Sequence, residues 1–160
     1  MKATALILSL GLLMATAGWA DSTGHASHHS GKPSGALPIA RQQVAFPARL
    51  KTETLANMRD HLLAIQEITA YLAEKQFDVA AEVAETRLGF SSLQRHGAHE
   101  VAKVMPEGMR TMGHAMHQAA SQLAVTAQTS GATGDISPAL RALSRVQRSC
   151  VACHSAYALK

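Results

Sequence analysis

From residue 51 onward, apolar and polar residues alternate with the three- and four-residue steps of amphipathic α-helices. A first helix is predicted from Thr52 to Lys75, and a second after a turn at Gln76-Phe77, with Asp78 as its N-cap. The apolar positions expected to face inward are Leu55, Met58, Leu62, Ile65, Ile68 and Leu72 in the first helix, and Val79, Val83 and Phe90 in the second.

Two further helices are predicted in the C-terminal half. One begins at Pro106 and ends near Gln128, and the other begins at Ser137 as N-cap and continues to the C-terminus. The loop between them contains Gly131 and Gly134, and Pro138 follows Ser137 in the first helical turn. The expected inward positions are Met109, Met112, Met116, Ala120, Leu123 and Ala127, then Leu140, Leu143 and Val146.

The predicted fold class is all-α. No segment shows strand-like alternation between hairpin turn signals, and β-branched and aromatic residues are scarce. Four amphipathic helices joined by short to moderate connections fold most simply as an antiparallel four-helix bundle. Because only 4% of the residues are aromatic and alanine is frequent, such a bundle buries little apolar area and would gain from a large apolar ligand.

The chain before residue 51 has a different character. An apolar run after Lys2 ends in Gly18-Trp19-Ala20, which predicts a signal peptide over residues 1–20, cleaved after Ala20, and export to the periplasm. The run is shorter than the roughly 20 residues that span a bilayer, so no stable membrane insertion is expected. Residues 21–50 are rich in Gly, Pro, Ser and His and are predicted to form a flexible tail, which leaves 51–160 as the folded domain.

Charge and cysteine content exclude several classes of protein. The formal net charge is +4, but only 16% of residues are charged and no run of Lys or Arg occurs, so a nucleic-acid partner is not expected. Two cysteines are too few for a small disulfide-stapled protein. In an oxidising compartment two neighbouring thiols tend to form a disulfide, so their proximity needs an explanation.

The two cysteines belong to Cys150-Val151-Ala152-Cys153-His154, which is the C-x-x-C-H attachment sequence for one haem c. On a helix Cys150, Cys153 and His154 share one face, so both thiols can form thioethers while the imidazole binds the iron. A redox-active dithiol and a structural disulfide remain as alternatives, whereas a structural zinc site lacks a second cysteine pair.

The motif lies at the C-terminus and is followed by Tyr157, giving a C-x-x-C-H-x-x-Y ending. In this the chain resembles the class II c-type cytochromes, the cytochrome c′ and cytochrome c556 group. Met105-Pro106-Glu107-Gly108-Met109 is similar to the Pro-x-Gly turn before the third helix of that group, although Met109 stands where Ser or Thr is more usual. The resemblance covers residues 51–160.

The resemblance implies that the haem is held near one end of the bundle, bound covalently to Cys150 and Cys153, with His154 as the proximal iron ligand. It also implies that Met58, on the first helix, is the distal ligand, as in the c556 type. The expected function is then a one-electron carrier between periplasmic redox proteins, not an enzyme, because His/Met ligation suits electron transfer. Members of the group often pair through their first two helices, so a homodimer is open.

Two other functions are weighed against electron transfer. If Met58 only fills space, the iron is five-coordinate and the chain is a cytochrome c′-like protein that binds NO or CO. A His/Met-rich copper-handling protein is the third hypothesis, because thioethers and imidazoles are ligands that copper prefers. Core packing is the preferred explanation of the methionines, because Met109, Met112 and Met116 fit the buried stripe of their helix. His61 could compete with Met58 for the iron, but it is interpreted as a partly exposed histidine at the margin of the first helix. The residues concerned are His96, His99, Met105, Met109, Met112, His114, Met116 and His117.

Overall fold

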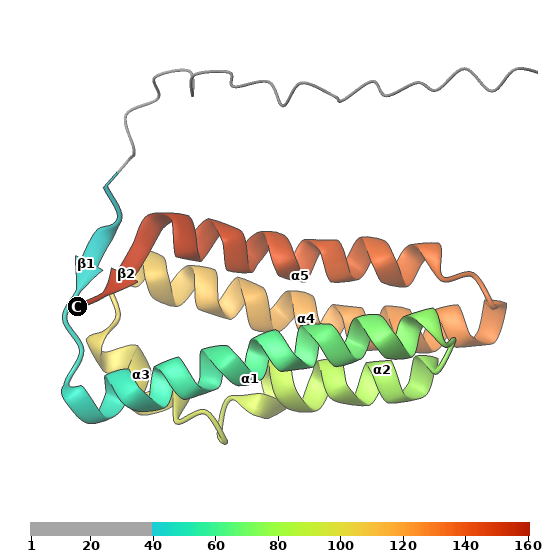
Figure 1. The fold of residues 1–160 in the computed structure, drawn as a ribbon, viewed down its shortest axis with the longest axis horizontal. Coiled ribbons are helices and arrows are strands. Elements are labelled where there is room, and N and C mark those ends of the chain that lie inside the picture. Colours follow the sequence, from blue (N-terminus) through green and yellow to red (C-terminus); the bar gives the residue numbers. More distant parts are fainter. Residues whose placement is uncertain (1–39) are drawn as a thin grey trace, which may run out of the picture. The chain divides into compact units, whose positions relative to one another are not determined.

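A computed structural model describes residues 40–160, and the predicted signal peptide and tail residues 21–39 lie outside this part (Figure 1). The described chain is all-α, as the periodicity predicts, except for two three-residue strands. Its helices are α1 (Ala48–Ala73), α2 (Phe77–Val83), α3 (Ala98–Val104), α4 (Glu107–Thr133) and α5 (Ser137–Ala156). A π-helical segment, η1 (Ala84–Leu88), continues α2, and a single 3-10 turn, η2 (Phe90–Ser92), follows it.

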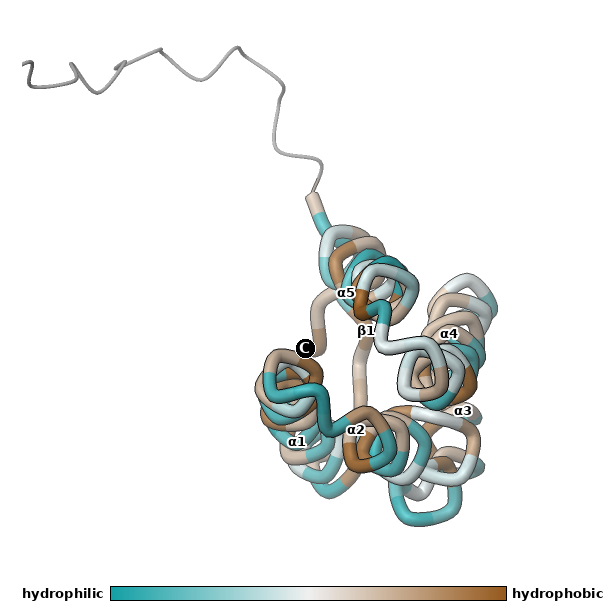
Figure 2. Tube along the Cα trace, turned by 90° about the vertical axis from the view of Figure 1, so that its right-hand side faces the viewer, coloured by the Kyte–Doolittle hydropathy of each residue, from teal (hydrophilic) through white to brown (hydrophobic). Residues whose placement is uncertain are grey.

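The long helices lie side by side. Seen along their axes, α1 has α2 on one side and α5 on the other, and α4 packs against both α2 and α5 (Figure 2). We call the buried residues between them the central core, and their many alanines let the helices approach closely. Its members include Ala64, Ile68, Leu72, Phe77, Ala80, Leu88, Met116, Ala120, Leu123, Ala127, Ala142, Leu143 and Val146.

Local sequence signals account for the helix boundaries. Pro47 and Pro106 occupy the N-cap positions of α1 and α4, where a missing backbone N–H costs nothing. Gly134 ends α4 with a φ of 75°, a conformation that suits glycine. The predicted N-cap at Ser137 is one residue late, because Ile136 occupies that position and the Asp135 carboxylate accepts the Ser137 N–H at 2.9 Å.

The first half of the chain departs from the predicted stripes. In α1 the expected inward residues Leu55 and Leu62 are 38% and 72% exposed, whereas the polar residues Thr54 and His61 are buried. The face of α1 that is buried is therefore rotated around the helix axis relative to the face that carries the most apolar residues. Hydrophobic periodicity alone does not reveal this rotation. The predicted N-cap of the second helix, Asp78, lies in the first turn of α2, because Gln76 is the N-cap. Val79 of α2 and Phe90 of η2 were both expected to face inward, but they are exposed. The short helix α3 was not predicted, and Leu140 of α5 is also exposed.

The prediction of no strands is wrong at one place. The strand β1 (Gln42–Val44) pairs in parallel with β2 (Tyr157–Leu159), so that Val44 lies opposite Leu159. Three-residue strands are too short to show alternation, and their pairing joins the two ends of the described chain. The predicted tail accordingly extends too far, since residues 42–50 belong to the fold. Val44, Phe46, Leu50, Val101 and Met109 form a second buried group, here called the end cluster.

Among residues 40–160, no helix combines the length and the apolarity needed to cross a membrane.

Candidate functional site

The C-x-x-C-H residues lie on the last turns of α5. Cys150 and Cys153 are half-buried free thiols, and His154 is exposed. Cys150 packs against the central core and Cys153 packs against the end cluster, so both thiols contact buried apolar residues. The spacing predicts that Cys150, Cys153 and His154 share one helix face; all three lie on α5, where the two cysteines are half-buried and His154 is exposed.

The surroundings of the thiols keep them protonated. Burial raises the pKa of the Cys150 thiol, and burial also raises that of Cys153. They lie near the C-terminal end of α5, where the helix dipole disfavours a thiolate. Reactive dithiols have lowered pKa values, and no disulfide joins these two cysteines, so neither the dithiol nor the disulfide alternative gains support.

Two separate sequence features meet beside this motif. Tyr157, three residues after His154, packs against the end cluster, and Gly108 lies in the first turn of α4. A Cβ atom added at Gly108 would lie 2.5 Å from the Tyr157 hydroxyl. A side chain at Gly108 would therefore displace the tyrosine hydroxyl, and the two motifs on which the resemblance rests are neighbours in space.

Met58 lies on the flank of α1 opposite Asp60 and Glu67, since it is roughly 160–180° from both around the helix axis. It is half-buried, and the exposed residues Leu55 and Leu62 lie on the same flank at three- and four-residue steps. Arg59 is exposed. Thr54, one turn before Met58, is buried, and its hydroxyl has no hydrogen-bond partner among the described residues.

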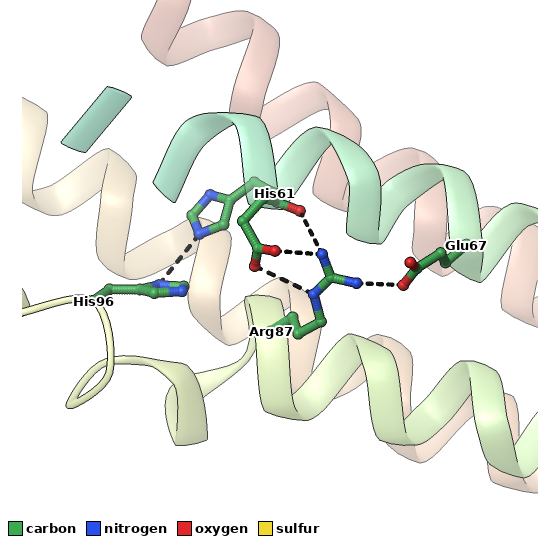
Figure 3. Close-up of polar contacts among 5 residues, drawn as sticks. His61, Glu67, Arg87 and His96 are labelled. Atoms are coloured by element: carbon green, nitrogen blue, oxygen red, sulfur yellow. Dashed lines mark hydrogen bonds and ion pairs between the residues drawn. The ribbon is translucent and has the colours of Figure 1, made fainter. Parts of the chain in front are cut away.

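The opposite flank of α1 is tied to η1 by an ion-pair network (Figure 3). The Arg87 guanidinium pairs with the carboxylates of Asp60 and Glu67, and its Nε donates to Asp60 Oδ2 at 3.2 Å. The hydrogen bond from Arg87 lowers the pKa of the Asp60 carboxyl. This network leaves Met58 and its apolar neighbours on the other flank of α1.

The Met/His group of α3 and α4 divides into two kinds of residue. Met109 and Met116 are buried, which supports the core-packing interpretation, and His99 and His114 are exposed. His117 differs from these two histidines because it is half-buried. In the described chain, no group of three or more His, Cys, Asp or Glu is arranged to hold a metal ion.

The predicted margin position of His61 is wrong. His61 is only 8% exposed, and its side chain contacts His96 (Figure 3). The ring of His117 lies close to it as well. Sequence reasoning missed this histidine group because its members come from α1, the connection before α3, and α4. The one available signal was the helical step from Thr54 to His61, which puts both on the buried face.

The two hollows described next do not contain the candidate cofactor residues. Two hollows lie along α2 and α4, one beside Phe77 and Gly131 and one beside Phe90 and Ser121, and neither is lined by the cysteines or Met58. Comparison with protein-family models, curated proteins and solved structures found no match to this chain.

Proposed function

We propose that this chain is a monohaem class II c-type cytochrome, of the cytochrome c′ and c556 group, that carries one electron between periplasmic redox proteins. The observation that supports it most is the placement of Cys150 and Cys153 as paired, half-buried, protonated thiols that contact buried apolar residues. Thiols held in this way suit covalent attachment of a large apolar ligand and are poorly suited to dithiol exchange.

The remaining residues fit such a ligand. His154 follows Cys153 directly and is exposed. Its imidazole makes no hydrogen bond within the described chain, so it is available as the proximal ligand. A large apolar ligand beside α1 would cover the exposed leucines of that helix. It would also lie near the Thr54 hydroxyl, which is buried without a hydrogen-bond partner among the described residues. The finer arrangement we propose is an antiparallel four-helix bundle formed by α1, α2 with η1, α4 and α5.

The two sides of α1 favour Met58 over His61 as the distal ligand. At roughly 100° per residue, Met58 and His61 are about 60° apart around the helix axis. His61 is engaged by His96 on the side of the α2–α3 connection, whereas Met58 lies beside the exposed residues Leu55 and Leu62. A thioether from Met58 therefore needs no existing side-chain bond to break.

Bound haem would supply a one-electron Fe(III)/Fe(II) couple. The chain would supply two covalent anchors, an imidazole from α5 and a thioether from α1, each fixed on a rigid helix. Ligands held in this way move little when one electron arrives from a donor protein and leaves to an acceptor, which keeps the reorganisation small. The apolar surroundings of Cys150 and Cys153 would restrict water and favour the less charged reduced state.

Optical spectra of the exported protein test the proposal in two steps. Covalent haem should survive denaturation and acid extraction, and it should be lost in the Cys150→Ala/Cys153→Ala variant. We expect low-spin spectra with a weak sulfur-to-iron band, and we expect Met58→Ala to abolish that band. Leu55→Ala, on the same flank, is the matched control and should keep it. Wild-type protein that matures without haem would refute the cytochrome proposal.

The same spectra decide between the two cytochrome hypotheses. High-spin spectra that do not change in Met58→Ala would refute His/Met ligation and support the five-coordinate protein that binds NO or CO. The half-buried position of Met58, which neither fills the core nor lies free in solvent, is why this alternative is retained.

A further inference from the structure

Three histidines meet at the junction of α1, α4 and the connection between η2 and α3. His61 Nε2 and His96 Nδ1 share a hydrogen bond of 3.3 Å, with ring centroids 4.9 Å apart. The rings of His61 and His117 are 6.1 Å apart, edge to face. His117 Nδ1 donates to the Leu88 carbonyl at 2.7 Å. We refer to His61, His96 and His117 as the histidine clasp.

The clasp ties the segment 89–97 to α1. Asn57 Nδ2 donates to the His96 carbonyl at 3.1 Å, so α1 holds His96 through both its main chain and its ring. The other end of the segment is fixed separately, since the Phe90 N–H donates to Ser121 Oγ at 3.0 Å. Loss of the clasp would leave the end of the segment near Gly97, which has a φ of 61°, with only the Asn57 bond to α1. A single neutral hydrogen bond contributes about 0.5–1.5 kcal/mol, which is too little to keep that end closed, whereas the start of the segment stays attached to α4.

The hydrogen bond at the centre of the clasp requires that at least one of the two rings is neutral. One imidazole nitrogen must donate and the other accept, but a protonated imidazole has no acceptor nitrogen, so two protonated rings cannot share the bond. The surrounding charges resist protonation, because only one carboxylate faces the group and Arg87 already engages it. The titratable groups that face the clasp are Asp60, Arg87, Arg95 and His114.

Burial acts in the same direction on all three rings. It lowers the pKa of His61 to about 4, with a further contribution from its two histidine neighbours. Burial likewise lowers the pKa of His96 and of His117. The clasp is consequently neutral and closed at neutral pH, and a proton enters most easily when the rings separate.

We propose that the histidine clasp is an acid-sensitive lock, which opens on protonation and releases the 89–97 segment from α1 while the long helices stay packed. Opening exposes His61 and the buried side of α1 next to it. The lock depends on contacts among the chain's own side chains and is independent of the proposed haem.

Hydrogen exchange of the full-length, haem-loaded protein, followed by mass spectrometry from pH 7 to pH 4.5, tests the lock. After correction for the intrinsic pH dependence of exchange, amides of 89–97 should open about tenfold to a hundredfold more for each pH unit below 6.5, because His61 and His96 can each take up a proton on opening. Amides of α4 and α5 should keep their protection. Uniform opening of the whole chain, or unchanged exchange of the segment, would overturn the proposal.

Histidine variants separate the lock from general acid effects. His96→Phe removes one of the two nitrogens that share the hydrogen bond, so exchange of 89–97 should be fast at every pH and lose its acid dependence. His99→Phe, at an 85% exposed side chain, is the matched control and should behave like the wild type. In the wild type, NMR titration should give depressed pKa values for all three clasp histidines. Acid opening that persists in His96→Phe, or ordinary values for all three histidines, would contradict the proposed mechanism.

Discussion

The ion-pair network of Arg87 gives a quantitative test of what holds η1 against α1. Arg87 reaches two carboxylates and also donates to the Asp60 carbonyl at 3.2 Å, with only 17% of its side chain exposed. Hydrogen bonds to charged groups contribute about 1.5–3 kcal/mol when sheltered, and exposed pairs about 0.2–1 kcal/mol. Asp60 and Glu67 are 39% and 31% exposed, so we expect Arg87→Met to cost about 2 kcal/mol of unfolding free energy.

The matched control is Arg49→Met, which removes the same charge from another arginine of the described chain. Arg49 pairs only with Glu53, one turn along α1, and the two side chains are 71% and 48% exposed. Its loss should cost less than about 0.5 kcal/mol.

Urea unfolding followed by far-UV circular dichroism measures both variants, and the midpoint should fall by about 1 M for Arg87→Met with an unchanged slope. If the two variants lose the same stability, the argument that partial burial strengthens the Arg87 network is wrong.

Two further predictions concern the acid response and the site's end of the bundle. Because the pKa of His61 is about 4 when folded and near 6.5 when unfolded, its contribution to stability is complete above pH 6.5. It is lost as the pH falls toward 4, by up to about 3 kcal/mol in urea unfolding, and His61→Gln should flatten this dependence. Gly108→Ala should displace Tyr157 and cost about 1 kcal/mol, whereas Gly113→Ala, with open space around it, should be neutral or slightly stabilising.

The proposed cofactor site was predicted from the sequence because its residues are neighbours along the chain. Cys150, Cys153 and His154 lie within five positions, and helical spacing alone determines that the thiols share a face. The same holds for the long helices, whose existence depends on a 3.6-residue period repeated over several turns. Pro47 was assigned to the tail, but it marks a helix start by the same local chemistry as Pro106.

The orientation of the helices could not be obtained in this way. Met58 shares a stripe with Leu55 and Leu62, yet the fold buries Thr54 and His61, because the neighbours of α1 are polar groups from distant segments as well as apolar ones. The clasp depends on His96 and His117, which lie 35 and 56 positions from His61 (96 − 61 and 117 − 61). Contacts over such separations leave no periodic trace in the sequence.

The sequence by itself therefore determined the helical class, the positions of the long helices and the place of the C-x-x-C-H motif on the final helix. The tertiary structure decided which face of each helix is buried, the pairing of the two chain ends as β1 and β2, and the meeting of Gly108 with Tyr157. The physical reason is the separation along the chain between the residues that interact. Backbone hydrogen bonding and side-chain spacing within a helix are local, whereas burial, ion pairing and shifts of pKa depend on residues that only folding brings together.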